Sequence, residues 1–339
     1  MGNRVSVRQE KSRPSTLLPL IGSNRSYLTL YIHSYRSHSE EKRYSIMQQI
    51  GEGTYSHVYE GFDTWSDQKC VLKVLKKTRK VRKITKEIKV LKLLQGGPNI
   101  ISLYDVIYNA TSANAILVFE HVENRPFGAL YRILSLDDIR FYLFQILKSL
   151  RHAHSKGIMH RDIKPHNIAI DHSQRKLRVL DWGLAEFYEP GKSYRVRVST
   201  LNYKAPELLV KNGKYDYSLD IWSFGYVLAE MLLRKHEFFR GKDKPDLLKK
   251  IVKVLGTDEL LRYIKKYNIT LGEGVAKELS GHKRKPWSSF VFALNAHLET
   301  PEGLDLLDKV LVYDHKQRLT AEEAMKHPFF DPIRSVEAV

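Results

Sequence analysis

The chain has 339 residues, a formal net charge of +18 at pH 7, 42% hydrophobic residues and a single cysteine. This length predicts two domains or one two-lobed unit, with enough apolar residues to bury a sizeable core. One cysteine excludes an internal disulfide and fits a reducing compartment, and no apolar run of about 18 residues is present to span a membrane. The positive charge favours polyanionic partners such as acidic proteins, nucleic acid or an anionic membrane surface.

The first 43 residues differ from the rest of the chain. They are rich in Ser, Arg and Tyr and show no sustained helical or strand period, so we expect a mostly flexible N-terminal extension over residues 1–43. The chain begins with the letters MGNRVS, a pattern that permits N-myristoylation at Gly2, and nearby basic residues offer a second, electrostatic signal. So short a pattern also occurs by chance. We therefore expect a membrane as a partner only if the chain is N-myristoylated.

Two strands joined by a glycine-rich turn are predicted next. Alternating apolar residues start at Tyr44, and a returning strand runs from Val58 to Phe62. The backbone N–H groups of such a turn can approach phosphates closely because glycine has no Cβ. A single turn of this kind is weak evidence for nucleotide binding. The residues that we expect to contact a nucleotide here are Ile50, Gly51, Glu52, Gly53, Thr54, Tyr55, Ser56, His57 and Val58.

A strongly basic amphipathic helix follows a further strand that ends at Lys73. Apolar residues recur at helical spacing from Ile84 to Leu94, and Glu87 is the one acid within the basic run. Charges of one sign offer no stabilising pattern of salt bridges along the helix, so we expect its outer face to dock acidic partners. The basic residues of this segment are Lys76, Lys77, Arg79, Lys80, Arg82, Lys83, Lys86, Lys89 and Lys92.

The rest of the chain is mostly helical in pattern. Two more strands are expected at about 103–108 and 115–120. A helix should begin at Ser135, where Asp138 completes a capping box, and end at Gly157. A buried helix is expected over 219–233.

The residues with the clearest chemistry lie between His160 and Gly183. A phosphoryl group in transfer carries charge on its three equatorial oxygens, so a hydroxyl must be positioned, charge neutralised and a metal held. Asp162 can accept the hydroxyl proton, and Lys164 can contact the γ-phosphate. Asn167 and Asp181 offer the oxygen ligands that Mg²⁺ prefers. Any one of these residues alone would more often cap a turn, but the ordered set predicts phosphoryl transfer.

This set resembles the catalytic loop and the metal-binding motif of eukaryotic protein kinases, and the segment 205–207 matches the family's Ala-Pro-Glu motif. The resemblance implies a bilobal α+β fold over residues 44–331, with a small β-rich N-lobe at about 44–122 and a larger helical C-lobe at about 123–331. It also implies ATP as the nucleotide, Mg²⁺ as the metal, and a pair between Lys73, which binds the α/β-phosphates, and Glu87. The residues that would surround the purine are Val71, Phe119, Glu120, Val122 and Leu180.

The match narrows to the casein kinase II catalytic (alpha) subunits. Trp182 within Asp-Trp-Gly, Ser56 in the glycine-rich turn and Val71 before the lysine are unusual features shared with that family. The resemblance implies a constitutively active serine/threonine kinase of the cytoplasm and nucleus that uses ATP or GTP and acts on acidic protein substrates. It further implies a dimeric regulatory beta subunit as a partner.

The same resemblance implies cations that read an acid after the phosphorylated residue. Arg197 and Lys204 match two of these cations, and Leu201 stands where the family has a third. Arg195 replaces a neutral residue nearby, so we expect it to compensate in part. The N-terminal extension also departs from the family pattern, and Ala169 replaces a larger residue expected under the base.

Three alternatives stay open. The first is a phosphorylation-gated relative of the cyclin-dependent or MAP kinases, although a Thr-x-Tyr spacing is absent between Asp181 and Glu207. The second is a scaffold pseudokinase, although the charged residues of the expected site are all present. The third is nucleic-acid binding through net charge. We expect no specific nucleic acid, because aromatic residues are not interleaved along the basic helix.

Overall fold

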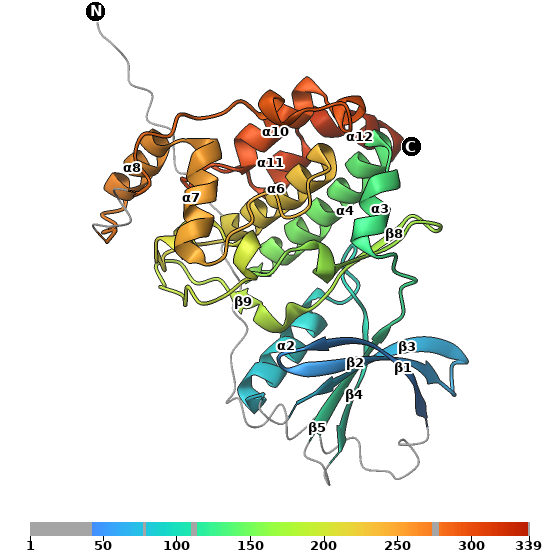
Figure 1. Ribbon diagram of the computed structural model, residues 1–339. Helices are drawn as coiled ribbons and strands as arrows, with labels where there is room; N and C mark the ends of the chain where they lie inside the picture. The colour runs from blue at the N-terminus through green and yellow to red at the C-terminus, as the bar shows by residue number, and fades with distance from the viewer. Residues whose placement is uncertain (1–42, 77–78, 110–113, 273–277, 338–339) are drawn as a thin grey trace, which may run out of the picture.

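The computed structural model describes residues 43–76, 79–109, 114–272 and 278–337, which form two lobes (Figure 1). The smaller N-lobe contains a five-stranded antiparallel sheet in the order β1-β2-β3-β5-β4 and the helix α2 (Val81–Leu94), and the larger C-lobe is mainly helical. The predicted bilobal α+β fold is confirmed. Residues 1–42 lie outside the described part of the chain, and with them the predictions of a flexible extension and of N-myristoylation.

The N-lobe sheet holds the glycine-rich turn. Strand β1 (Tyr44–Gly53) pairs with β2 (Ser56–Asp63) so that Gly53 faces Ser56, which leaves Thr54 and Tyr55 as a two-residue turn. Strand β3 (Gln68–Leu75) lies between β2 and β5 (Asn114–Glu120), and β4 (Leu103–Asn109) forms the edge. The turn therefore projects from one end of the sheet.

Two long helices form the centre of the C-lobe. Helix α4 (Leu136–Ser155) starts with the predicted capping box, in which Ser135 Oγ accepts from the N–H of Asp138 while the Asp138 carboxylate accepts from the N–H of Ser135. Every residue of α6 (Ser218–Leu233) is buried, because an almost uniformly apolar helix is stable only inside a core. Within the described segments, no helix combines the length and the apolar character needed to cross a bilayer.

Shorter elements complete the C-lobe and hold the functional loops. Two small antiparallel sheets pair β6 (Ile158–Met159) with β9 (Glu186–Phe187) and β7 (Ile168–Asp171) with β8 (Lys176–Val179). They position the loops that precede and follow them. The other α-helices within the described residues are α3 (Phe127–Ile133), α5 (Pro206–Leu209), α7 (Lys244–Leu255), α8 (Thr257–Lys266), α10 (Pro301–Val310), α11 (Ala321–Met325) and α12 (Asp331–Glu337).

The two lobes are joined by backbone contacts as well as by the chain itself. The N–H of Val179 donates to the carbonyl oxygen of Asn99 at 2.8 Å, and the N–H of Ile101 donates to the carbonyl oxygen of Val179 at 3.3 Å. Asn99 adopts a left-handed conformation with φ 59°, as a short polar residue can. The segment after α2 is thus tied to β8, two residues before Asp181.

Candidate active site

The loop that carries Asp162 is held in place by a buried carboxylate of the C-lobe core. Asp220, in α6, accepts from the N–H groups of His160 at 2.8 Å and Arg161 at 2.7 Å. Burial would raise the pKa of Asp220, but a hydrogen bond from His154 and the charge of that ring outweigh it and lower the pKa. Arg161 takes a left-handed φ of 69°, which an L-residue adopts only when its surroundings impose it. The loop is therefore held by the C-lobe core.

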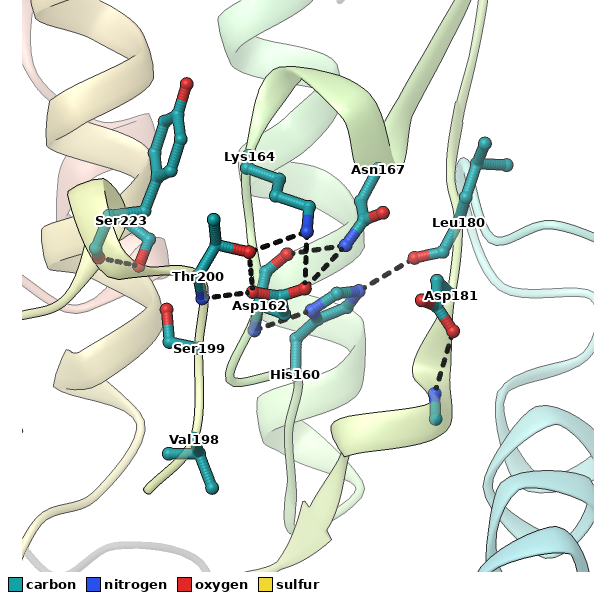
Figure 2. A network of polar contacts seen from close by, with 12 residues as sticks. His160, Asp162, Lys164, Asn167, Leu180, Asp181, Val198, Ser199, Thr200 and Ser223 are labelled. Carbon is teal, nitrogen blue, oxygen red and sulfur yellow. Dashed lines mark hydrogen bonds and ion pairs between the residues drawn. The ribbon is translucent and has the colours of Figure 1, made fainter. Parts of the chain in front are cut away.

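Three residues converge around Asp162, and the four together are called here the hydroxyl-side cluster: Asp162, Lys164, Asn167 and Thr200 (Figure 2). Asp162 Oδ1 accepts from the N–H of Thr200 at 2.7 Å and from Thr200 Oγ1 at 2.9 Å. Lys164 Nζ lies 2.9 Å from Asp162 Oδ2 and 2.6 Å from Thr200 Oγ1. Asn167 Nδ2 donates to the carbonyl oxygen and to Oδ2 of Asp162, at 2.8 and 3.1 Å. The carboxylate is thereby oriented on both of its oxygens.

His160 links this cluster to the second motif. Its Nε2 donates to the carbonyl oxygen of Leu180 at 2.9 Å, and its Nδ1 accepts from the N–H of Asp162 at 3.1 Å. The N–H of Asp162 can only donate, so Nδ1 must be unprotonated and the proton lies on Nε2. The ring also contacts Trp182 edge-on, with centroids 4.5 Å apart. The segment that leads to Asp181 is therefore fixed relative to Asp162.

A second group spans both lobes and is called the phosphate-side cluster: Lys73, Glu87 and Asp181. Lys73 Nζ lies 2.9 Å from Glu87 Oε1 and 2.7 Å from Asp181 Oδ1. Burial disfavours the ammonium form of Lys73, but the two carboxylates outweigh burial and raise its pKa. Desolvation of the Asp181 carboxylate, whose side chain is still about half exposed, would raise its pKa, and the charge and hydrogen bond of Lys73 instead hold that pKa far below its usual range. The sequence-based pairing of Lys73 with Glu87 is present.

Arg79 differs from its sequence-based interpretation as part of a cationic outer face. It is only 8% exposed, and its Nη2 donates to Glu87 Oε2 at 2.5 Å. Glu87 thus has one oxygen on Lys73 and the other on Arg79. The reason is geometric, because Arg79 precedes the helix and folds back over its buried face instead of following the helical period.

Other cations of the basic segment are partly neutralised from outside the helix. Lys76 pairs with Glu52 at 2.8 Å and Lys86 with Glu186 at 2.9 Å, while Lys89 lies over the ring of Phe187. From the sequence we expected no salt bridges in this basic segment, because only neighbours along the helix can be compared there. Lys77 lies outside the described residues.

The donor set around Asn167 and Asp181 fits a magnesium ion. Asn167 uses its Nδ2 on Asp162, and within the described residues no donor reaches its Oδ1. Asp181 uses Oδ1 on Lys73, and its side chain is 46% exposed. A carboxylate and an amide oxygen are hard ligands that suit Mg²⁺, which keeps several waters and needs few protein ligands. Among the described residues, no group of three or more His, Cys, Asp or Glu side chains could form a denser metal site.

The residues expected around a nucleotide lie on the strands and loops that border both clusters. Val71 pairs with Phe119 across β3 and β5, and Phe119 is 8% exposed. The side chain of Glu120 points elsewhere: it binds Lys176 at 2.9 Å and Arg178 at 2.8 Å. Its backbone alone is left to contact a base. The side chains of Ile50, Val58, Val71, Val122 and Leu180 are all incompletely buried and can line an apolar site.

The three predicted substrate cations are not placed alike. Arg195 and Arg197 are exposed on the segment between β9 and α5. Lys204 is 7% exposed, and its Nζ donates to the carbonyl oxygens of Val198 and Ser199, the latter at 2.6 Å. Burial lowers the pKa of Lys204 to about 8. Lys204 therefore supports the backbone beside Thr200 and does not present its charge at the surface, which differs from the sequence-based expectation.

A family comparison agrees with this geometry. The model of the protein kinase domain matches residues 44–330 of the chain. The chain belongs to the protein kinase family. Membership implies transfer of a phosphoryl group with ATP and Mg²⁺. The hydroxyl-side and phosphate-side clusters are the parts of this protein kinase domain that would carry out that transfer.

Sequence reasoning missed several residues of the site. Thr200 lies in the segment that lacks a Thr-x-Tyr spacing and was given no role, and Arg79 was interpreted only as a surface charge. The signal for Asp220 was present, since an acid inside an apolar helix needs buried partners. Nothing in the local sequence marks Thr200 or Arg79, because their partners lie 38 and 8 residues away along the chain.

Proposed function

We propose that this protein kinase is specific for serine and threonine. The observation that carries the proposal is the contact of Thr200 with Asp162. A threonine places both its N–H and its Oγ1 on one carboxylate oxygen, at 2.7 and 2.9 Å. An aliphatic hydroxyl close to its own backbone therefore reaches Asp162, with Lys164 beside it. A tyrosine hydroxyl lies at the far end of its ring, so a tyrosine substrate would need its backbone further from Asp162.

In this mechanism each chain residue has one task. Asp162 orients the substrate hydroxyl and accepts its proton, and Lys164 stabilises charge on the transferred group. Lys73, held by Glu87, positions the phosphates, while Asn167 and Asp181 would hold the metal. Bound Mg²⁺ supplies neutralisation of the phosphate charge. Three peptides that differ only in Ser, Thr or Tyr at one position test the proposal, since equal or faster phosphorylation of the Tyr peptide would contradict it.

We also propose that activity does not depend on phosphorylation of the segment between Asp181 and Glu207, called here the activation segment. The support is Arg161, whose Nε donates to the carbonyl oxygen of Leu184 at 2.8 Å and whose Nη1 donates to Tyr215 at 3.0 Å. Its Nη2 lies 3.5 Å from Glu186, which also binds Lys86. An internal carboxylate thus occupies the guanidinium, so a phosphate is not required there. Phosphatase treatment should leave activity unchanged, whereas a large loss would favour the phosphorylation-gated alternative.

Acidic protein substrates are proposed on charge and on the resemblance to casein kinase II catalytic subunits. Arg195 and Arg197 are exposed on the segment that precedes Thr200, and the net charge is +18. Because Lys204 is buried and Leu201 is neutral, we expect weak selection for acid directly after the phosphorylated residue and stronger selection further along. A peptide array tests this, with Leu201→Arg expected to strengthen the first position. Basophilic or proline-directed preference would contradict the proposal.

The remaining features follow from the same resemblance and are proposed together. GTP should serve as well as ATP within roughly tenfold in KM, because the Glu120 side chain is bound elsewhere and the backbone would read the purine. We propose a dimeric beta subunit as a partner and the cytoplasm and nucleus as locations. Co-purification tests the beta subunit, and cell fractionation tests the two locations. Mass spectrometry of the mature N-terminus decides whether a lipid adds a membrane location.

A further inference from the structure

A hollow of about 970 Å³ opens in the C-lobe, beside Lys253 of α7. It is bordered by the residues that follow α6, by Lys253 of α7 and by two stretches of chain, 281–286 and 289–295. It shares no residue with the hydroxyl-side or the phosphate-side cluster. The kinase reaction therefore leaves this hollow without a role.

The charge around the hollow has one sign. No acidic residue is among those that line it. Arg284 is neutralised by Glu259 at 3.3 Å and Asp308 at 2.5 Å. No carboxylate among the described residues pairs with the other cations of the lining, and the ammonium of Lys235 lies over the ring of Phe238, 5.1 Å from its centroid. These cations are Arg234, Lys235, Lys253, Lys283 and Lys285.

Arg234 is the most constrained of these cations. It follows the last residue of α6 in a left-handed conformation, with φ 52°. Its Nη2 donates to the carbonyl oxygen of Leu134 at 2.6 Å, while Nη1 is buried and has no partner in the described part of the chain. Burial lowers the pKa of Arg234 for lack of a counter-charge. A buried donor without an acceptor is unfavourable, so an anion nearby would be stabilised.

The floor and rim of the hollow are apolar. Phe238 and Phe290 pack against each other with ring centroids 5.1 Å apart. At the rim, Phe292 is 65% exposed and Leu294 is 74% exposed, which is unusual for side chains of this size. Single exposed apolar residues are common, but here two stand next to a cationic hollow.

A buried amide holds this rim in place. Asn295 is 3% exposed, and its Nδ2 donates to the carbonyl oxygens of Leu233 at 2.8 Å and Phe290 at 3.1 Å. Its Oδ1 accepts from the N–H of Phe292 at 2.7 Å. The rim is thus fixed to the end of α6, and its apolar side chains are presented without an ordering cost on binding.

We propose that this hollow is a docking site for a protein segment in which an aromatic side chain is flanked by carboxylates. The aromatic ring would pack on Phe238 and Phe290 with Phe292 at its edge, and the carboxylates would meet Lys253, Lys285 and Arg234. A bare polyanion would leave the apolar floor unused, and an apolar peptide would leave the cations uncompensated. The inference does not rest on the proposed substrate preference, because the hollow contains none of the residues assigned to substrate binding.

The test is direct binding to the full-length chain. The probe is a fluorescein-labelled peptide with two phenylalanines flanked by aspartates and no Ser, Thr or Tyr, so that it cannot be phosphorylated. Fluorescence anisotropy gives its Kd for the wild type, for Lys253→Glu with Lys285→Glu, and for Phe292→Ser. Exposed residues elsewhere in the C-lobe provide matched controls in Lys156→Glu, after α4, and Val336→Ser, in α12, the latter position being 75% exposed.

We expect the double charge variant to weaken binding by roughly tenfold or more and Phe292→Ser by about fivefold, with both controls within about twofold of the wild type. Equal Kd values for hollow and control variants would overturn the proposal. It would also be overturned if a peptide with alanine in place of phenylalanine bound equally well, or if a single-stranded oligonucleotide bound more tightly through the same residues. Phosphorylation of a short unrelated peptide at the wild-type rate shows that a variant is folded. If a variant fails this control, the milder substitutions Lys285→Gln and Phe292→Ala replace it in the binding measurement.

Discussion

The two halves of the active site are built differently. The hydroxyl-side cluster lies entirely in the C-lobe, and its loop is bound through backbone N–H groups to Asp220 inside α6. The phosphate-side cluster joins β3 and α2 of the N-lobe to Asp181 of the C-lobe through charged side chains. The first is fixed by the core, whereas the second exists only while the lobes keep their present relation. The comparison teaches that the orientation of Asp162 depends on the C-lobe alone, whereas the contact between Lys73 and Asp181 depends on both lobes.

The largest effect is expected from Asp162→Ala. The change removes the group that accepts the hydroxyl proton and frees both Thr200 and Asn167. The kcat should fall by about 10²–10⁴-fold with little change in the KM for ATP. Steady-state kinetics at saturating peptide measure it. Near-normal turnover would show that the hydroxyl-side cluster is not where the proton is accepted.

Lys73→Met and Glu87→Gln should each lower kcat by roughly hundredfold, because each removes charge from the group that positions the phosphates. The two substitutions act on one pair, so the double variant should lose little more than either alone. A double-mutant cycle in kcat/KM for ATP measures the coupling. Additive losses would mean that Lys73 and Glu87 do not act as a unit. The phosphate-side cluster would then not differ from the hydroxyl-side cluster in the way described above.

A smaller effect is expected from Thr200→Val. Valine keeps the N–H bond to Asp162 and removes the hydroxyl that contacts Asp162 and Lys164, so kcat should fall by roughly tenfold. Thr200→Ser retains the hydroxyl and serves as the control. The KM for ATP should not change in either variant. Equal kcat for the Val and Ser variants would show that the hydroxyl contributes nothing to the orientation of Asp162.

The smallest effect is expected on the pH dependence of stability, through Glu230 and its hydrogen bond with Tyr203. Glu230, in α6, accepts from Tyr203 at 3.2 Å, and burial, partly offset by hydrogen bonds and the charge of His236, raises its pKa from 4.5 to about 7. The folded state then binds the proton more tightly than the unfolded state. The stabilisation that Glu230 gives the folded state is therefore full below about pH 4.5 and is lost as the pH rises through about 7.

Glu230→Gln should therefore flatten the dependence of unfolding free energy on pH between about 4.5 and 7. Denaturant unfolding of wild type and variant at several pH values measures this difference, with the Glu302→Gln variant at the first turn of α10 as a control. The same slope in the wild type and in Glu230→Gln would show that Glu230 does not titrate in this range.

Much of the fold and of the chemistry could be predicted from local patterns. The capping box at Ser135, the buried run of α6 and the strand that carries Lys73 depend on neighbours in the sequence, and the structure contains each of them. The spacing of Asp162, Lys164 and Asn167 follows from a single loop. These features were predictable because short-range periodicity and backbone geometry decide them.

Contacts between distant segments could not be predicted in this way. Whether Lys204 is exposed depends on the path of the chain around Val198, and whether Arg79 belongs to the surface depends on how it folds over Glu87. Thr200 becomes part of the site only when the segment before α5 returns to the catalytic loop. The sequence by itself determined which chemical groups this kinase carries, and the tertiary structure alone decided which of them face each other, because a charge has the same local pattern whether its partner is water or a buried carboxylate.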